Sequence, residues 1–141
     1  MKINTRYLPK NLTRKDKRTQ KNMLMKSRRL YKKGIYYTRK RVKSFTSKKS
    51  SHIVRAQKMY NVDKIGATNE LAKATKCSKK ALAKIINKGM GAYFSSGSRP
   101  NQTAKSWGLA RLASAITKGK AAKVDYKILQ KGCKPSSKAL R

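Results

Sequence analysis

Apolar residues in the stretch 69–116 recur at spacings of three and four residues, which place them on one face of an α-helix. The first part of this pattern includes Leu71, Leu82 and Ile85 and is broken in the middle, as two short helices with a tight turn between them would be. The second part runs over residues 107–116. Three such helices can enclose a small core. The sequence therefore predicts an all-α fold built around a small helical core.

A glycine-rich stretch, residues 89–103, lies within this pattern and has too few aliphatic residues for a core element. We expect it to be a loop. Its N–H groups, hydroxyl groups and single guanidinium suit a phosphate cradle, although no Gly-Lys-Ser/Thr string marks a P-loop. The alternative is a structural loop in which Pro100, Asn101 and Thr103 set up the next helix. The expected phosphate contacts are Ser95, Ser96, Ser98 and Arg99, beside Gly89, Gly91 and Gly97.

The charge of the chain constrains its partners. Thirty-nine Lys and Arg stand against four acids, a formal net charge of +35 over 141 residues. A body with a small core and that charge repels itself, so we expect a polyanion beside it: nucleic acid first, then an anionic membrane surface or an acidic protein. No window reaches the roughly 18 apolar residues of a transmembrane helix, and the basic N-terminus lacks the apolar core of a signal peptide.

Composition divides the chain into three expected parts. Residues 1–60 hold 21 of the basic residues and one acid, and they predict a long basic, partly extended arm with one or two helices. Residues 61–132 predict the small helical domain, and residues 133–141 a mobile basic tail.

Within the arm, Thr13 and Gly34 suit the start and the end of one helix, although a disordered basic tail is the alternative. A short helix is expected at 52–60 after a Ser/Lys-rich linker at 44–51, and another at 124–131.

The break in the first apolar pattern has the spacing of a helix-turn-helix. Ala72 would let the second helix pack closely, Ser78 would cap it, and Leu82 and Ile85 would hold it in place. Lys76 occupies the turn position that glycine usually takes. The outward face of the second helix would then carry Lys79, Lys80, Ala83, Lys84 and Asn87. The alternative is an ordinary helical hairpin, since no Arg, Gln or Glu occupies a base-reading position.

The residues of common catalytic and metal sites are sparse. Cys77 and Cys133 are expected to be reduced and partly buried, because a disulfide lacks the support of a secretory signal. With His52 as the single histidine, no metal-ligand spacing and no cofactor site is recognised. No two carboxylates are close in sequence, and Tyr93 near Arg99 lacks the basic constellation of a strand-transfer enzyme. We expect a protein that is not an enzyme and has no small-molecule substrate.

Several strings carry a family likeness: Arg-Tyr-Leu-Pro at 6–9, the stretch 27–37, the stretch 91–104 with Ser-Gly-Ser-Arg-Pro-Asn-Gln-Thr, and the stretches 106–115 and 124–126. Together they resemble a family of small basic proteins of large nucleocytoplasmic DNA viruses of algae and amoebae. The resemblance implies a viral origin and a virion component, and it assigns no catalytic residue. In that family glycine is common where this chain has Lys76 and Lys118.

These observations predict a virion structural protein, either a minor capsid protein or an internal core component. Its expected partners are capsid or other virion proteins and nucleic acid, chiefly DNA bound without sequence specificity. Its expected location is the interior side of the capsid or core, after assembly in the host cytoplasm or nucleus. The alternatives are a helix-turn-helix regulator and a ribosomal-type RNA binder. Beside the loop residues named above, the expected polyanion contacts are Arg14, Lys21, Arg28, Arg29, Lys32, Arg39, Lys40, Arg41, Lys43, Lys79, Lys80 and Lys84.

Overall fold

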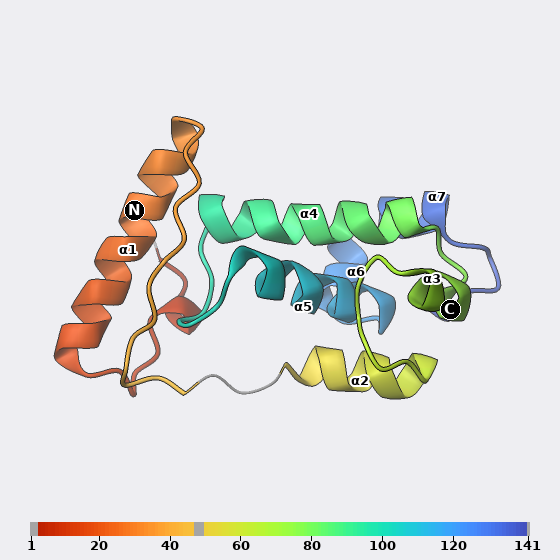
Figure 1. Ribbon diagram of the computed structural model, residues 1–141, viewed down its shortest axis with the longest axis horizontal. Helices are drawn as coiled ribbons and strands as arrows, with labels where there is room; N and C mark the ends of the chain where they lie inside the picture. Colours follow the sequence, from red (N-terminus) through yellow and green to blue (C-terminus); the bar gives the residue numbers. More distant parts are fainter. Residues whose placement is uncertain (1–2, 47–49, 141) are drawn as a thin grey trace. The chain divides into compact units, whose positions relative to one another are not determined.

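The computed structural model describes residues 3–46 and 50–140, and its secondary structure is helical (Figure 1). The all-α prediction is confirmed, since the described residues form no strand beyond an isolated bridge between Cys77 and Cys133. The predicted linker and the outer ends of the predicted arm and tail include residues 47–49, 1–2 and 141, which lie outside this description. The elements are the 3-10 helix η1 (Thr5–Tyr7) and the α-helices α1 (Arg14–Lys32), α2 (Ser51–Tyr60), α3 (Asn69–Thr75), α4 (Lys79–Ser95), α5 (Ala104–Ile116), α6 (Lys120–Val124) and α7 (Tyr126–Gly132).

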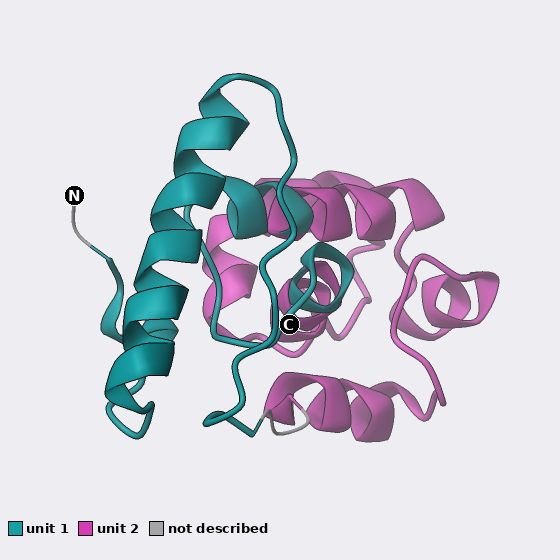
Figure 2. Cartoon of the chain, turned by 60° about the vertical axis from the view of Figure 1, so that its left-hand side comes forward, with its two compact units in different colours: residues 1–48, 90–107 teal, residues 49–89, 108–141 magenta. Residues whose placement is uncertain are grey.

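The chain forms two compact units, shown in different colours in Figure 2. Unit 1 comprises residues 1–48 and 90–107, and unit 2 comprises residues 49–89 and 108–141. The chain leaves unit 2 within α4 and re-enters it within α5. This division differs from the sequence-based one, because residues 1–48 of the expected arm share a unit with residues 90–107, while residues 49–60 of the arm and the expected tail belong to unit 2.

Local signals define α1 in unit 1. The Thr13 hydroxyl accepts a hydrogen bond from the Asp16 N–H at 3.2 Å and caps the helix. Gly34, with a φ of +78°, ends it in the left-handed conformation that glycine adopts without strain. The helix prediction is therefore confirmed over the disordered alternative. Its buried residues recur at helical spacing: Gln20, Met23, Leu24 and Ser27.

Within unit 1, residues 97–101 contact α1 and the segment that follows it. Gly97 has a φ of +126°, and a Cβ at this position would lie 2.8 Å from a methyl carbon of Leu24, so the close approach requires glycine. The Asn101 side chain accepts a hydrogen bond from the Val42 N–H at 2.7 Å and donates to the carbonyls of Val42 and Phe45. The predicted arm is thus partly extended, as expected, but it folds back on its own unit.

Unit 2 is organised around α5. Residues 112–116 of this helix are all buried, and because successive helical residues point about 100° apart, the helix is enclosed on every side. In Figures 1 and 2 this part of α5 lies between α4 and α2. The Tyr60 hydroxyl of α2 donates to the Ile116 carbonyl. On the α4 side, a Cβ at Gly89 would lie 2.6 Å from the Gly108 Cα, so the two helices approach at a pair of glycines.

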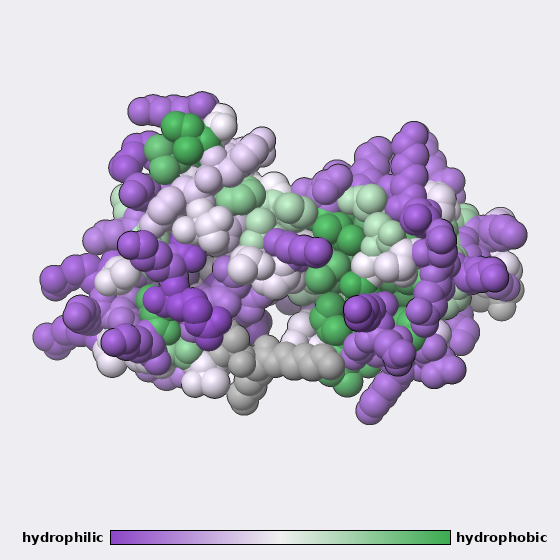
Figure 3. Space-filling model, in the orientation of Figure 1, coloured by the Kyte–Doolittle hydropathy of each residue, from purple (hydrophilic) through white to green (hydrophobic). Residues whose placement is uncertain are grey.

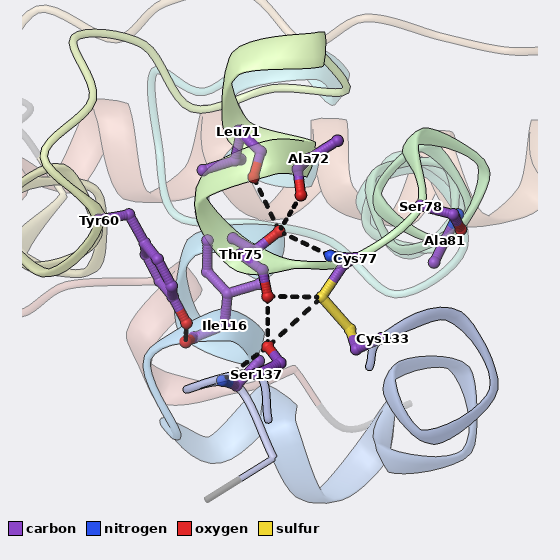
Figure 4. Close-up of a disulfide and its surroundings, with 11 residues drawn as sticks. Tyr60, Leu71, Ala72, Thr75, Cys77, Ser78, Ala81, Ile116, Cys133 and Ser137 are labelled. Atoms are coloured by element: carbon purple, nitrogen blue, oxygen red, sulfur yellow. Dashed lines mark hydrogen bonds between the residues drawn. A yellow bond between two sulfur atoms is a disulfide. The ribbon is translucent and has the colours of Figure 1, made fainter. Parts of the chain in front are cut away.

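A disulfide joins Cys77 to Cys133, which corrects the prediction of two reduced thiols (Figure 4). The two cysteines are 56 residues apart, so their sequence positions carry no sign of the pairing. Backbone hydrogen bonds bring them together: the Ser78 N–H donates to the Gly132 carbonyl at 2.8 Å, and the Lys134 N–H to the Lys76 carbonyl at 2.9 Å.

Two further predictions are wrong. Residues 89–95 are the last turns of α4, not a loop, because the fully buried Tyr93 supplies the apolar contact that aliphatic residues were expected to provide. The C-terminal segment is packed rather than mobile: Ser137 and Ala139 are buried, and the Ser137 hydroxyl donates to the Thr75 carbonyl beside the disulfide (Figure 4).

Two lysines occupy turn positions with a left-handed backbone, which favours glycine. Lys76 and Lys118 adopt positive φ values of 61° and 64°, in the left-handed region. Lys76 caps α3, and Lys118 follows α5. Both turns therefore form with a side chain in a conformation that favours glycine, at a cost of roughly 1 kcal/mol each.

No helix in the part of the chain that the structure describes is both long enough and apolar enough to cross a membrane. The same residues contain no group of three His, Cys, Asp or Glu side chains that could hold a metal ion.

Candidate polyanion-binding surfaces

One face of α1 carries a row of cations, which we name the α1 stripe: Arg14, Arg18, Lys21, Arg29 and Lys32. These residues follow one another at intervals of three, four or eight, so they align along the side of the helix opposite its buried face. All five are exposed. From Arg14 to Lys32 the stripe is about 27 Å long at 1.5 Å per residue, about eight base pairs of duplex DNA at 3.4 Å per pair. In Figure 3 hydrophilic side chains project over the part of the surface that α1 occupies.

Little negative charge opposes the stripe within unit 1. The unit contains twenty Lys and Arg and one acid, Asp16. The Asp16 carboxylate accepts a hydrogen bond from the Ser44 N–H at 2.8 Å, and hydrogen bonding from Ser44 lowers the pKa of this carboxyl group. In unit 2, the buried Asp125 binds Arg111 through two hydrogen bonds of 2.8 and 2.9 Å. Asp16 and Asp125 therefore each bind a group of their own unit.

The structure places most of the predicted contact residues on the surface. Of the sixteen predicted residues, Arg39 and Ser98 are buried and Arg28 is half-buried. The exposed ones are Arg14, Lys21, Arg29 and Lys32 on α1, Lys40, Arg41 and Lys43 after it, Lys79, Lys80, Lys84 and Ser95 on α4, and Ser96 and Arg99 beyond α4.

Arg39 is not a surface cation. Its side chain is 7% exposed, and its guanidinium donates to the Tyr93 carbonyl at 2.9 Å and to the hydroxyls of Ser27 and Ser98 at 2.9 and 2.8 Å. The guanidinium carbon lies 3.8 Å from the centre of the Tyr93 ring, a cation–π contact. Burial lowers the pKa of this guanidinium, which still stays charged. Neutral oxygens and an aromatic face hold Arg39, so the prediction that it contacts a polyanion is wrong, and so is the prediction for Ser98.

The predicted phosphate cradle has the wrong polarity. Its N–H groups at Ser96 and Gly97 both donate to the Ala92 carbonyl, at 2.9 and 3.0 Å, as α4 ends. The end of a helix presents carbonyl oxygens and the negative end of its dipole, which attract cations. The Arg28 guanidinium accordingly donates to the Ser96 carbonyl, at 2.6 and 2.9 Å. The prediction failed because it treated the C-terminal end of a helix as a loop with free N–H groups.

The string Gly-Ser-Arg-Pro-Asn at 97–101 is mainly structural. Ser98 binds Arg39, Pro100 is fully buried, and Asn101 binds the segment 42–45. Arg99 alone in the string is exposed. It lines a shallow hollow of about 250 Å³ together with Arg6, Pro9 and Phe45. The alternative prediction, that Thr103 sets up the next helix, is confirmed: Thr103 and Ser106 exchange backbone-to-hydroxyl hydrogen bonds of 2.9 and 3.1 Å at the start of α5.

A helical hairpin is present in unit 2, as both the helix-turn-helix prediction and its alternative require. A turn at residues 76–78 joins α3 to α4, and the Ser78 hydroxyl accepts from the Ala81 N–H at 3.1 Å, as predicted for a cap. Lys79, Lys80, Lys84 and Asn87 are exposed, and Ala83 is half-buried. The end of α7 packs against the first turn of α4, since a Cβ at Gly132 would lie 2.2 Å from the Ala81 Cβ. Lysines on the open face can contact phosphates but carry no base-reading pattern.

The two tyrosines at the end of α1, Tyr31 and Tyr36, were not predicted as contacts. Tyr31, Tyr36 and Phe94 form a cluster on the surface of unit 1, with Tyr36 70% exposed. The available signal was the pair of tyrosines on either side of Lys32, Lys33 and Gly34. The return of the chain at Gly34, which brings the tyrosines together, is not visible in an apolar pattern.

Comparison with known proteins gives one match. Residues 5–132 match the sequence family described as a family of unknown function (DUF5824). No curated protein and no solved structure matches the chain.

Proposed function

The chain belongs to the family of unknown function DUF5824, and we propose that it is a non-enzymatic polyanion-binding structural protein whose main ligand is the phosphate backbone of nucleic acid. The observation that carries the proposal is the α1 stripe. Five exposed cations line one helix, on the side opposite its buried face, in a unit with a single acid that is bound elsewhere. A regular row of cations on a rigid helix suits a regular row of phosphates.

The affinity would be largely independent of sequence. Lys and Arg on an exposed helix face bind phosphates and fix the position of the protein, but they do not distinguish bases. This favours a packaging or scaffolding role over sequence-specific regulation. The helix-turn-helix hairpin of unit 2 supports the regulator as the second candidate, with Lys79, Lys80 and Lys84 on its open face, and a preferred site selected from a random DNA pool would establish it.

We place the protein in a virus particle, as a minor capsid or internal core component. The resemblance to proteins of large DNA viruses supports this placement, and so does the disulfide between Cys77 and Cys133. Disulfides persist on virions and in oxidising compartments but are rare in proteins that remain in a reducing cytosol. Acidic surfaces of other virion proteins are the alternative ligand. Recovery of the protein with emptied, nuclease-treated shells would favour them, and release with the genome would favour nucleic acid.

The test is a salt titration of binding to a 20-base-pair duplex, followed by fluorescence anisotropy. If all five cations of the stripe contact phosphates, they contribute about −4.5 to the slope of the logarithm of affinity against the logarithm of salt concentration. Exchanging the five for Gln should remove this contribution and leave only that of other exposed cations.

A control variant exchanges five exposed lysines of unit 2 for Gln, so that both variants lose the same charge: Lys64, Lys120, Lys123, Lys127 and Lys131. Its slope should stay within one unit of the wild-type value. Equal slopes in the two variants would show that total charge and not the stripe determines binding, and a flat titration of the wild-type protein would refute polyanion binding altogether.

A further inference from the structure

An exposed aromatic cluster lies where α1 ends. The Tyr36 ring centre is 5.1 Å from that of Phe94 and 6.0 Å from that of Tyr31, and the rings of Tyr31 and Phe94 are nearly parallel, 7° apart, at 6.5 Å. These distances are in the range of direct aromatic contact. Three of the ten aromatic residues of the chain therefore gather in one surface cluster.

The turn after α1 produces the cluster. The N–H groups of Gly34 and Ile35 donate to the carbonyls of Tyr31 and Leu30, both at 2.9 Å, which closes the helix and sends the chain back along it. Tyr36 is thereby returned to the side of Tyr31. The Tyr31 hydroxyl also lies near Gly91 of α4, 3.8 Å from the position that a Cβ there would take, which is an ordinary van der Waals distance.

Packing alone does not account for this surface. Tyr36 is 70% exposed, Ile35 49% and Tyr31 37%, although a folded protein gains free energy by burying such side chains. In Figure 3 hydrophobic atoms appear at the turn after α1, beside hydrophilic side chains. Within unit 1 the exposed cations Arg29, Lys32 and Lys33 flank these residues along the chain.

We propose that this cluster is a stacking platform for the bases of single-stranded nucleic acid, at the end of α1 where the exposed cations Arg29, Lys32 and Lys33 can bind its phosphates. The proposal rests on the proposed function and deepens it by naming the class of polyanion. Positive charge beside exposed ring faces is the arrangement that binds single strands, since phosphates pair with cations while unstacked bases cover the rings. A duplex keeps its bases paired and stacked, so it can use the stripe but not the platform.

Affinities measured with four 20-residue ligands at one salt concentration test the platform: oligo-dT, oligo-rU, a duplex, and an abasic deoxyribose-phosphate strand. The variants are Tyr36→Ala, Tyr36→Leu and Tyr36→Phe in the full chain. Loss of the ring in the first two should weaken binding of oligo-dT or oligo-rU by about 5- to 150-fold, the value of roughly one stacked base. Tyr36→Phe should keep wild-type affinity, and binding to the duplex and the abasic strand should change less than twofold.

Met25→Ala is the matched control, because Met25 is also an exposed apolar residue of α1, at 41%, but lies outside the cluster. It should leave all four affinities unchanged. Tyr36→Leu and Tyr36→Phe both keep an apolar side chain. Comparing these two variants therefore remains informative even if Tyr36→Ala lowers stability.

Equal affinities of the wild-type protein and Tyr36→Leu for both single strands would overturn the platform. If the duplex still bound with the slope of the stripe, the proposed function would stand without it. Binding of the cluster to phosphatidylserine vesicles but not to oligo-dT or oligo-rU, lost in Tyr36→Leu, would also overturn it and assign the surface to a membrane.

Discussion

Replacing Arg39 by Met tests whether this arginine stabilises the fold or binds a ligand. The substitution keeps a long side chain but removes three hydrogen bonds of the guanidinium, to the Tyr93 carbonyl and to the hydroxyls of Ser27 and Ser98, together with the cation–π contact. Each hydroxyl still has a hydrogen-bond partner without the guanidinium, because Ser27 donates to the Phe94 carbonyl and Ser98 to the Arg99 carbonyl. The buried Tyr93 carbonyl loses its guanidinium partner.

The free energy of unfolding should fall by about 3 kcal/mol. Hydrogen bonds from a charged donor contribute roughly 1.5 kcal/mol each at the lower end of their range, and the stripped carbonyl adds about 1 kcal/mol. Removing the desolvation cost of a buried guanidinium offsets part of that sum. With a urea m-value of about 2 kcal/mol per molar, the loss corresponds to a midpoint lower by about 1.5 M.

The assay is urea unfolding followed by the fluorescence of Trp107. Trp107 is the single tryptophan of the chain and belongs to unit 1, where its ring contacts Tyr7 at 6.0 Å, so its emission reports on the unit that holds Arg39. Arg41→Met is the matched control: it removes the same charge two residues away, from an exposed side chain, and should change stability by less than about 0.5 kcal/mol.

The two variants should affect nucleic-acid binding in the opposite order to stability. Arg39→Met should leave the salt slope unchanged under conditions where it is folded, because the guanidinium is inaccessible, whereas Arg41→Met can lower it by up to about 0.9. A midpoint shift below about 0.5 M for Arg39→Met, or a reduced slope with intact stability, would refute the assignment of Arg39 to the interior.

Two further predictions concern unit 2. Replacing both Cys77 and Cys133 by Ser opens a link across 56 residues and should lower stability by about 4 kcal/mol; thermal unfolding followed by circular dichroism checks it, and equal melting temperatures of this variant and the oxidised protein would contradict it. Burial raises the pKa of Tyr60 to about 12, against about 10 when unfolded, so its contribution is fully present below pH 10 and is lost as the pH rises to 12. The urea midpoint should therefore drop more between pH 9 and 11 in the wild-type protein than in Tyr60→Phe, and parallel curves would exclude this linkage.

Elements with local causes could be predicted from the amino-acid sequence. The Thr13 cap and Gly34 define α1, and the Ser78 cap with its flanking aliphatic residues defines the start of α4, because each signal acts through residues one helical turn apart. The exposure of most predicted lysines and arginines also followed from composition, since a small core cannot bury them.

Tertiary structure alone decided which polar residues are used inside the fold. Arg39 meets Tyr93 across 54 positions and Cys77 meets Cys133 across 56, while Tyr36 joins Phe94 only because the chain reverses after α1. No periodicity or local spacing encodes such pairs, because they depend on how separate helices pack and where their ends meet. The same residue type, arginine, is therefore a core hydrogen-bond donor at position 39 and an exposed cation at position 41, and only the packing of unit 1 distinguishes the two.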